Sequence, residues 1–139
     1  MTARWLLAGV LVAPIAALAL GVWAEFADLG PLLLLIIAVP AIVVATVSAA
    51  SLLPAAQRPP ALVLLAVLLG TLTFGLTEGS YIAIHLSRGG YLNFEGLGSQ
   101  RAMAAALIGI HLGVGAVVGA GIGLGLTALS LAGRRLRSA

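Results

Sequence analysis

The sequence of 139 residues has no cysteine, no lysine and very little charge of either sign. Without cysteine, the chain can form no disulfide, thiolate metal site or cysteine nucleophile. Charged residues make up 8% of the sequence and hydrophobic residues 62%, whereas a soluble domain has about 25% charged residues. This composition excludes a water-soluble globular domain. We therefore expect an integral membrane protein whose first partner is the lipid bilayer.

The seven basic residues are all arginines, and they are scattered through the sequence. Nucleic-acid-binding proteins instead gather basic residues on a patch or stripe, which this chain lacks, so we expect no nucleic-acid partner. The arginine preference and the abundance of alanine, glycine, leucine and valine are typical of GC-rich prokaryotic genomes. We therefore place the protein in a prokaryotic plasma (inner) membrane.

Four hydrophobic runs, residues 5–24, 31–53, 61–86 and 102–131, are each long enough to cross a bilayer, which takes about 20 apolar residues in a helix. Proline, glycine and polar residues interrupt the hydrophobic sequence between them, and such residues end helices. The sequence therefore predicts one all-α domain over residues 1–139. We expect four transmembrane helices in an antiparallel bundle.

The arginines also predict the orientation of the spans. With a cytoplasmic N-terminus, five arginines fall on the inner side and two on the outer side, in agreement with the positive-inside rule. The inner ones are Arg4, Arg58, Arg134, Arg135 and Arg137, and the outer ones are Arg88 and Arg101. Both termini are then cytoplasmic. A signal peptide ending near residues 17–19 is a weaker alternative, because the apolar run continues to Trp23.

The fourth span is rich in glycine. At 100° per residue, Gly115, Gly119 and Gly123 form one row, and Gly109 and Gly113 belong to a second row beside it. Small residues at this spacing let transmembrane helices pack closely. Glycine in a helix costs about 1 kcal/mol relative to alanine, so we expect protein to cover this face. Packing within the bundle could account for it, as could contact with a second copy or with other membrane subunits.

The third span carries polar residues on one face. Glu78, Tyr81 and His85 are spaced i, i+3 and i+7, and His111 lies at a similar depth to Glu78 in the fourth span. Ionisable groups within a span are costly and face a bundle interior, a cavity or a partner. If the third and fourth helices are neighbours, Glu78 and His111 can meet. These four residues are our candidates for an ion or proton relay.

Two other interpretations of these side chains stay open: a structural hydrogen-bonded pair and a ligand or cofactor contact. A haem between His85 and His111 is disfavoured because the two residues lie at different depths. Two histidines with scattered carboxylates have no metal-ligand spacing either. We therefore predict no cofactor and no metal.

The longest connection, SRGGYLNFEGLGSQR, joins the third and fourth spans on the outer side. It could lie in the headgroup layer, fold over the Glu78 region or dock on a partner subunit. Ser99 fits the N-cap of the fourth helix. The candidate contact residues of this connection are Arg88, Tyr91, Asn93, Phe94, Glu95 and Arg101.

Three classes of function fit these features. The first is an accessory or interaction subunit of a membrane assembly, or a homo-oligomer, that uses the glycine-rich helix. The second is an oligomeric proton- or ion-coupled transporter or channel that uses Glu78 with His111. The third is a membrane enzyme acting on lipid or quinone, which we disfavour because no catalytic motif is present and no catalytic residue can be assigned. We favour the first class from the sequence alone.

Overall fold

The computed structural model describes residues 2–27, 31–93 and 98–137, and for residues 31–33, 135 and 137 it describes only the backbone. Within these residues the chain forms four α-helices and one short 3₁₀ helix. They are α1 (Ala3–Phe26), α2 (Pro31–Leu52), η1 (Pro54–Gln57), α3 (Pro59–Ser87) and α4 (Gln100–Arg137). The predicted all-helical architecture is confirmed. Each α-helix contains a segment long and apolar enough to cross a membrane.

The helix boundaries differ from the predicted spans in ways that affect the site. We expected the first span to end at residue 24, but α1 continues to Phe26 and so includes Glu25. The PAAQRPP connection is more ordered than a plain turn, since Pro54–Gln57 forms η1 and Pro59 begins α3. Proline at the first position suits a helix start, because its missing N–H would have no partner there.

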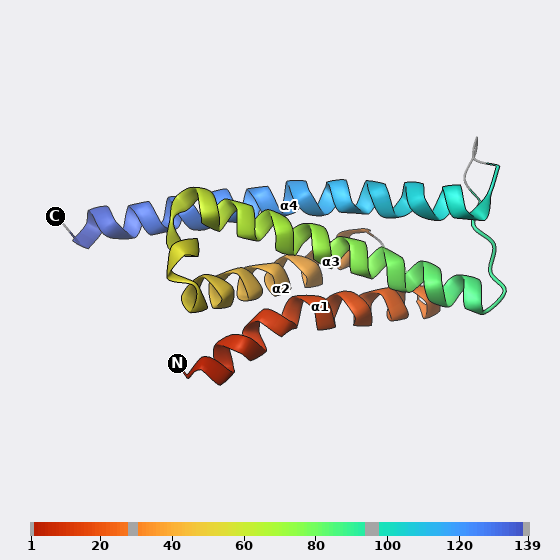
Figure 1. Ribbon diagram of the computed structural model, residues 1–139, viewed down its shortest axis with the longest axis horizontal. Coiled ribbons are helices and arrows are strands. Elements are labelled where there is room, and N and C mark those ends of the chain that lie inside the picture. The colour runs from red at the N-terminus through yellow and green to blue at the C-terminus, as the bar shows by residue number, and fades with distance from the viewer. Residues whose placement is uncertain (1, 28–30, 94–97, 138–139) are drawn as a thin grey trace.

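The helices lie side by side along one long axis (Figure 1). The N-terminal end of α1 and the C-terminal end of α4 both lie toward the left of this view, and the connection between α3 and α4 lies at the right. Helix α1 changes direction near its middle, where the sequence contains Pro14. A proline inside a helix removes one backbone hydrogen bond and commonly causes such a bend.

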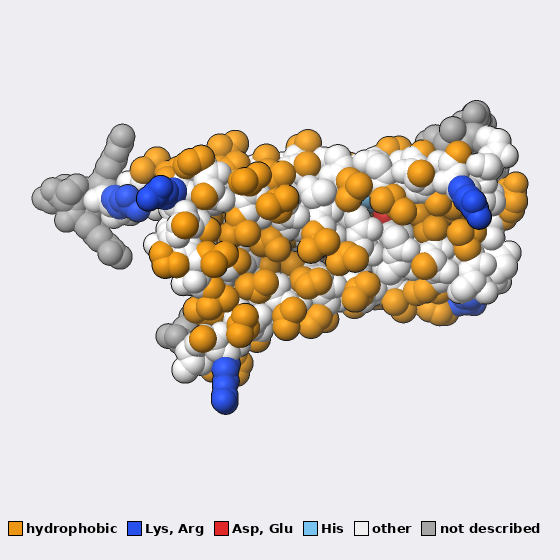
Figure 2. All heavy atoms as spheres, in the orientation of Figure 1, with side chains coloured by type: hydrophobic (Ala, Val, Ile, Leu, Met, Phe, Trp, Pro, Cys, Tyr) orange, Lys and Arg blue, Asp and Glu red, His pale blue; other side chains and the backbone are white. Residues whose placement is uncertain are grey.

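The core is small, and all four helices contribute to it. Leu20, Ala38, Ile42 and Phe74 form its centre, and partly buried residues of α4, such as Val118, pack against them. Many other large hydrophobic side chains face outward over most of the visible surface, while the arginines lie at the two ends (Figure 2). So much exposed hydrocarbon is unfavourable in water and natural in a bilayer.

Helix α3 packs most extensively against α4. A Cβ atom on Gly119 would meet the carbonyl oxygen of Ala66, and one on Gly123 would meet the Cα of Val63. The Gly115, Gly119 and Gly123 row therefore lies directly against α3. This close approach is the kind of packing that holds helices together in lipid, where little hydrophobic force acts between them.

The second glycine row has no such neighbour. Added Cβ atoms on Gly109 and Gly113 would meet nothing within 4 Å among the described residues. The bundle thus accounts for one of the two rows and leaves the other on the exposed side of α4. From the sequence we expected protein to cover both rows as one broad surface. Periodicity alone does not show which side of a helix its neighbour occupies.

Helix α4 is longer than a membrane requires. Its 38 residues correspond to about 57 Å at 1.5 Å per residue, compared with a hydrocarbon core of about 30 Å. In Figure 1 its C-terminal turns project beyond the ends of its neighbours. This end of α4 carries Arg134, Arg135 and Arg137.

Candidate functional site

A cavity of about 230 Å³ lies inside the bundle and is lined by all four helices. Its wall is apolar where α1 and α2 contribute Leu20, Ala24, Leu34 and Ala38. Helix α3 adds Phe74, Thr77, Glu78 and Tyr81, and α4 adds His111. We call this space the Glu78 cavity. It brings an acid, an imidazole and a phenol together in otherwise hydrophobic surroundings.

Glu78 and His111 lie next to each other across the α3–α4 contact. His111 Nε2 is 3.4 Å from Glu78 Oε2, and the residue Glu78 is only 9% exposed. His111 stands one turn before Gly115, at which α4 meets α3. The close packing of the glycine row therefore holds the imidazole beside the carboxyl group.

The second ring nitrogen of His111 determines where a proton can be held. His111 Nδ1 lies 2.9 Å from the carbonyl oxygen of Leu107. A carbonyl oxygen can only accept, so Nδ1 carries the hydrogen. Nε2 then faces Glu78 either as an acceptor or, with a second proton on the ring, as a donor. A favourable contact needs one proton between the two groups, on the carboxyl group or on the imidazole.

The threonines at and near the cavity make hydrogen bonds within their own helix. Thr77 donates its hydroxyl hydrogen to the carbonyl oxygen of Thr73, and Thr73 donates to that of Leu69. Such bonds to the preceding turn are the usual way for a helix to accommodate threonine. The Glu78–His111 contact is different because it joins two helices, and it is therefore the chemically distinctive feature of this cavity.

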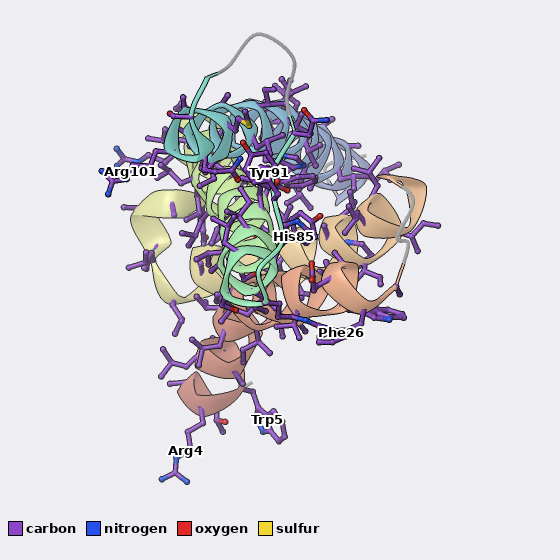
Figure 3. The ribbon with its side chains drawn as sticks, turned by 90° about the vertical axis from the view of Figure 1, so that its right-hand side faces the viewer. Arg4, Trp5, Phe26, His85, Tyr91 and Arg101 are labelled. Carbon is purple, nitrogen blue, oxygen red and sulfur yellow. The ribbon has the colours of Figure 1, made fainter. Side chains whose placement is uncertain are left out.

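A second acid–histidine pair lies toward the end of the bundle where α3 meets its connection to α4. His85 Nδ1 is 2.9 Å from Glu25 Oε2, and Arg88 Nε is 3.9 Å from Glu25 Oε1. The Arg88 guanidinium also lies over the Phe26 ring, 4.6 Å from its centre, in a cation–π arrangement. Figure 3 views this end, with His85 near the middle, Phe26 below it and Arg101 pointing away at the edge.

Tyr81 connects the two pairs. It lines the Glu78 cavity, and its ring stacks on that of His85 with 5.5 Å between the ring centres. Glu78, Tyr81 and His85 thus form a continuous polar row along α3. The sequence predicted this row from helix periodicity, but it did not include Glu25. Glu25 could have been found from its place at the end of the first helix, at the level of His85. We had ended that span at residue 24, two residues before the end of α1.

The connection after α3 is held against the helix ends. Gly90 N–H donates to the carbonyl oxygen of His85, and a Cβ atom on Gly90 would meet the imidazole ring. Leu92 is buried with Ile82 and Met103. Gly89 has a φ of +80°, which glycine adopts readily and other residues do not. The turn at Gly89 therefore lays the chain over His85.

Gln100 fastens the same connection to α4. Leu92 N–H donates to Gln100 Oε1, and Gln100 Nε2 donates to the Leu92 carbonyl oxygen, both at 2.8 Å. Ser99 caps α4 as the sequence predicted, because its hydroxyl oxygen accepts from Ala102 N–H at 3.1 Å. The sequence did not indicate the role of Gln100, since nothing in its spacing marks a partner eight residues away.

The candidate contact residues of this connection do not converge on one place. Tyr91 and Asn93 are exposed, as is Arg101 on the first turn of α4, while Arg88 contacts Glu25. Phe94 and Glu95 lie outside the described residues. Each histidine contacts a different carboxylate. Among the described residues, no group of three or more His, Cys, Asp or Glu side chains is arranged to hold a metal ion.

No family model, curated protein or solved structure matches this chain at a significant level. Its function must therefore be argued from its own residues.

Proposed function

We propose that this protein is a small multi-pass membrane protein that binds a proton at the Glu78–His111 pair and relays it through the bundle. One observation carries the proposal: His111 Nε2 faces the buried Glu78 carboxyl group at 3.4 Å, while Nδ1 donates to Leu107. One proton can be held on either partner, and the second partner accepts or donates without leaving its place. Buried acids and histidines serve as proton relays in many membrane transport proteins.

The polar row along α3 supplies the route. A proton released from Glu78 would reach the His85–Glu25 pair through water beside Tyr81, which lines the cavity and stacks on His85. The lining of the cavity is mostly hydrocarbon, which limits the entry of larger hydrated ions. The geometry therefore favours a proton over a metal cation as the species that is moved.

The proposal includes an orientation. The four helices cross a prokaryotic plasma membrane as an antiparallel bundle with both termini in the cytoplasm, and the His85–Glu25 pair faces outward. This orientation is supported by the excess of arginine near the two termini and the α2–α3 connection, because cytoplasmic segments carry more Lys and Arg than external ones.

Proton flux into liposomes tests the relay. The full chain is reconstituted with a pH-sensitive dye inside the vesicles, and a potassium gradient with valinomycin drives proton entry. We expect flux above that of empty vesicles, and at least a tenfold loss in Glu78→Gln, which removes the ionisable group but keeps a similar shape. Arg4→Gln, which removes a charge at the exposed N-terminal end of α1, is the control and should retain the flux.

Two outcomes would overturn the relay. Equal flux in Glu78→Gln and the unmodified protein would show that this carboxyl group carries no proton. Flux no greater than that of empty vesicles, with folded protein verified by circular dichroism, would leave the Glu78–His111 pair as a contact that joins α3 to α4.

The second candidate function is that of an accessory subunit in a membrane assembly or homo-oligomer, as we expected from the sequence. It is supported by the second glycine row, since Gly109 and Gly113 have no neighbour within 4 Å of an added Cβ atom among the described residues. A helix partner could approach this side of α4 closely.

Native mass spectrometry distinguishes the assemblies. Protein extracted from its own host in a mild detergent would retain larger membrane proteins at fixed stoichiometry if it is an accessory subunit, or copies of itself if it is a homo-oligomer. Gly113→Leu should disrupt either assembly, whereas Leu129→Ala, at an exposed position nearer the C-terminus of α4, should not. A monomer under all of these conditions would rule out both assemblies.

A further inference from the structure

At the end of the bundle opposite the His85–Glu25 pair, a groove of about 290 Å³ runs between α2, η1, α3 and α4. Its apolar wall contains Val47, Leu62 and Leu126. Its polar wall contains Ser51, Gln57, Ser130 and Arg134. We call it the Arg134 groove. It is independent of the Glu78 cavity and shares no lining residue with it.

Polarity changes along the groove in the same direction on two helices. On α4, apolar Leu126 is followed one turn later by Ser130 and two turns later by Arg134. On α2, apolar Val47 is followed one turn later by Ser51. Leu126 and Arg134 are eight positions apart, which corresponds to about 12 Å along the helix. The groove is thus hydrocarbon-like toward the bundle centre and polar toward its end, which is the profile of a lipid from its acyl chains to its headgroup.

The groove contains hydrogen-bond donors that are not used within the described part of the protein, and these donors suit an anion. Ser51 already donates to the Val47 carbonyl oxygen, and Gln57 Nε2 donates to that of Ala50. The Ser130 hydroxyl and the Arg134 guanidinium remain, and among the described residues no acid lies within ion-pair distance of Arg134. An arginine fork and a hydroxyl are well-suited donors to phosphate oxygens.

A buried hydroxyl group lies beside the groove. Thr127 Oγ1 is shielded from solvent and makes no hydrogen bond among the described residues. It lines a small recess that shares Gln57, Leu62, Ser130 and Arg134 with the groove. Buried polar atoms of this kind are uncommon in native structures, and a bound water or ion is one of the ordinary reasons for them.

The charges of the chain favour an anionic occupant. All four acids occur between residues 25 and 95, whereas both terminal segments and the α2–α3 connection carry only arginine. Figure 2 shows blue arginine side chains and no red acidic ones at this end of the visible face. Basic pockets between transmembrane helices on the cytoplasmic side bind the headgroups of anionic lipids.

We infer that the Arg134 groove is a binding site for an anionic phospholipid. The phosphate accepts hydrogen bonds from Arg134 and Ser130, and an acyl chain lies along Val47, Leu62 and Leu126. This inference does not depend on proton transfer at Glu78. It concerns a lipid that stays bound to the bundle where α2, α3 and α4 meet.

The experiment uses the full chain in dodecyl maltoside, with phosphatidylglycerol and phosphatidylcholine of identical acyl chains as probes. Lipid binding is titrated by native mass spectrometry, and thermal unfolding is followed in parallel. We expect phosphatidylglycerol to bind more tightly and to raise the unfolding temperature more than phosphatidylcholine. Arg134→Gln should weaken phosphatidylglycerol binding about fivefold, which corresponds to one basic group near an anionic headgroup.

Two variants test whether the lipid binds in the Arg134 groove. Arg4→Gln removes the same charge from the N-terminal end of α1, which points away from the bundle in Figure 3, and should keep the preference for phosphatidylglycerol. Leu126→Trp fills the apolar part of the groove and should weaken binding of both lipids. If Arg134→Gln does not fold, Ser130→Ala together with Leu126→Trp still tests both ends of the groove.

Three results would overturn the inference. Equal binding of the two lipids would show that no anionic headgroup is recognised. An equal loss in Arg4→Gln and Arg134→Gln would show a diffuse charge effect instead of a site. Stabilisation by soluble glycerol 3-phosphate as large as that by phosphatidylglycerol would show that the ligand is a free phosphate compound.

Discussion

Gly70 of α3 and Gly115 of α4 face each other so closely that a Cβ atom on either one would meet the carbonyl oxygen of the other. The obstacle on both sides is backbone, which cannot move aside as a flexible side chain can. This pair therefore fixes how near the two helices lie. It also sets the position of His111, one turn away, relative to Glu78.

The first prediction concerns this contact. Gly115→Ala should destabilise the protein by about 1–3 kcal/mol, the usual cost of overpacking a tight interior. Gly113→Ala should be neutral or stabilise it by up to about 1 kcal/mol, because alanine is the better helix former and this side is open. Unfolding in mixed micelles, followed by circular dichroism, measures both. Equal effects would contradict the assignment of the two glycine rows.

The second prediction concerns the Glu78–His111 pair. Glu78→Leu and His111→Leu should each destabilise the protein, because each leaves its partner's polar group without its contact in the bundle. The double variant should be less unstable than the sum by about 1 kcal/mol, a usual coupling for side chains in contact. A double-mutant cycle of unfolding free energies measures this coupling. A value near zero would mean that the 3.4 Å contact contributes nothing.

The third prediction concerns the chain segment over His85. Gly90→Ala should displace the imidazole ring, since the new Cβ atom would meet it, and should weaken its contact with Glu25. The ring is a movable side chain, so the loss of stability should be small. Nitrogen NMR of labelled histidine should show a shifted His85 signal and an unchanged His111 signal. Gly98→Ala, where an added Cβ atom would meet nothing within 4 Å among the described residues, is the control and should shift neither.

The fourth prediction concerns Gln100. Replacement by alanine removes both hydrogen bonds to Leu92 and should cost about 1–3 kcal/mol in local stability. Amide hydrogen exchange at Leu92 should then be roughly tenfold faster or more, since each 1.4 kcal/mol is a factor of ten. Asn93→Ala, at an exposed neighbouring position, should leave the exchange rate unchanged. Unchanged exchange in Gln100→Ala would show that Leu92 is held by packing alone.

Several features of the site were predictable because they depend only on helix geometry. The spacing of Glu78, Tyr81 and His85 puts them on one face of any α-helix. Counting residues from the connection between α3 and α4 puts Glu78 and His111 at a similar depth, and their side chains do lie in contact. The partnership of His85 with Glu25 was not predictable in this way. The two residues are 60 positions apart, and only the packing of α1 beside α3 brings them together.

The sequence by itself determined that the chain is all-helical, that it has four helices able to cross a membrane and where polar groups interrupt them. These properties follow from local hydrophobicity and from the turn preferences of proline and glycine. Only the tertiary structure decided which glycine row meets α3, which acid meets each histidine, and where the Glu78 cavity and the Arg134 groove lie. The physical reason is that hydrophobicity nearly uniform around a helix does not fix its rotation. That rotation is set by close packing between helices, at contacts such as Gly70 with Gly115.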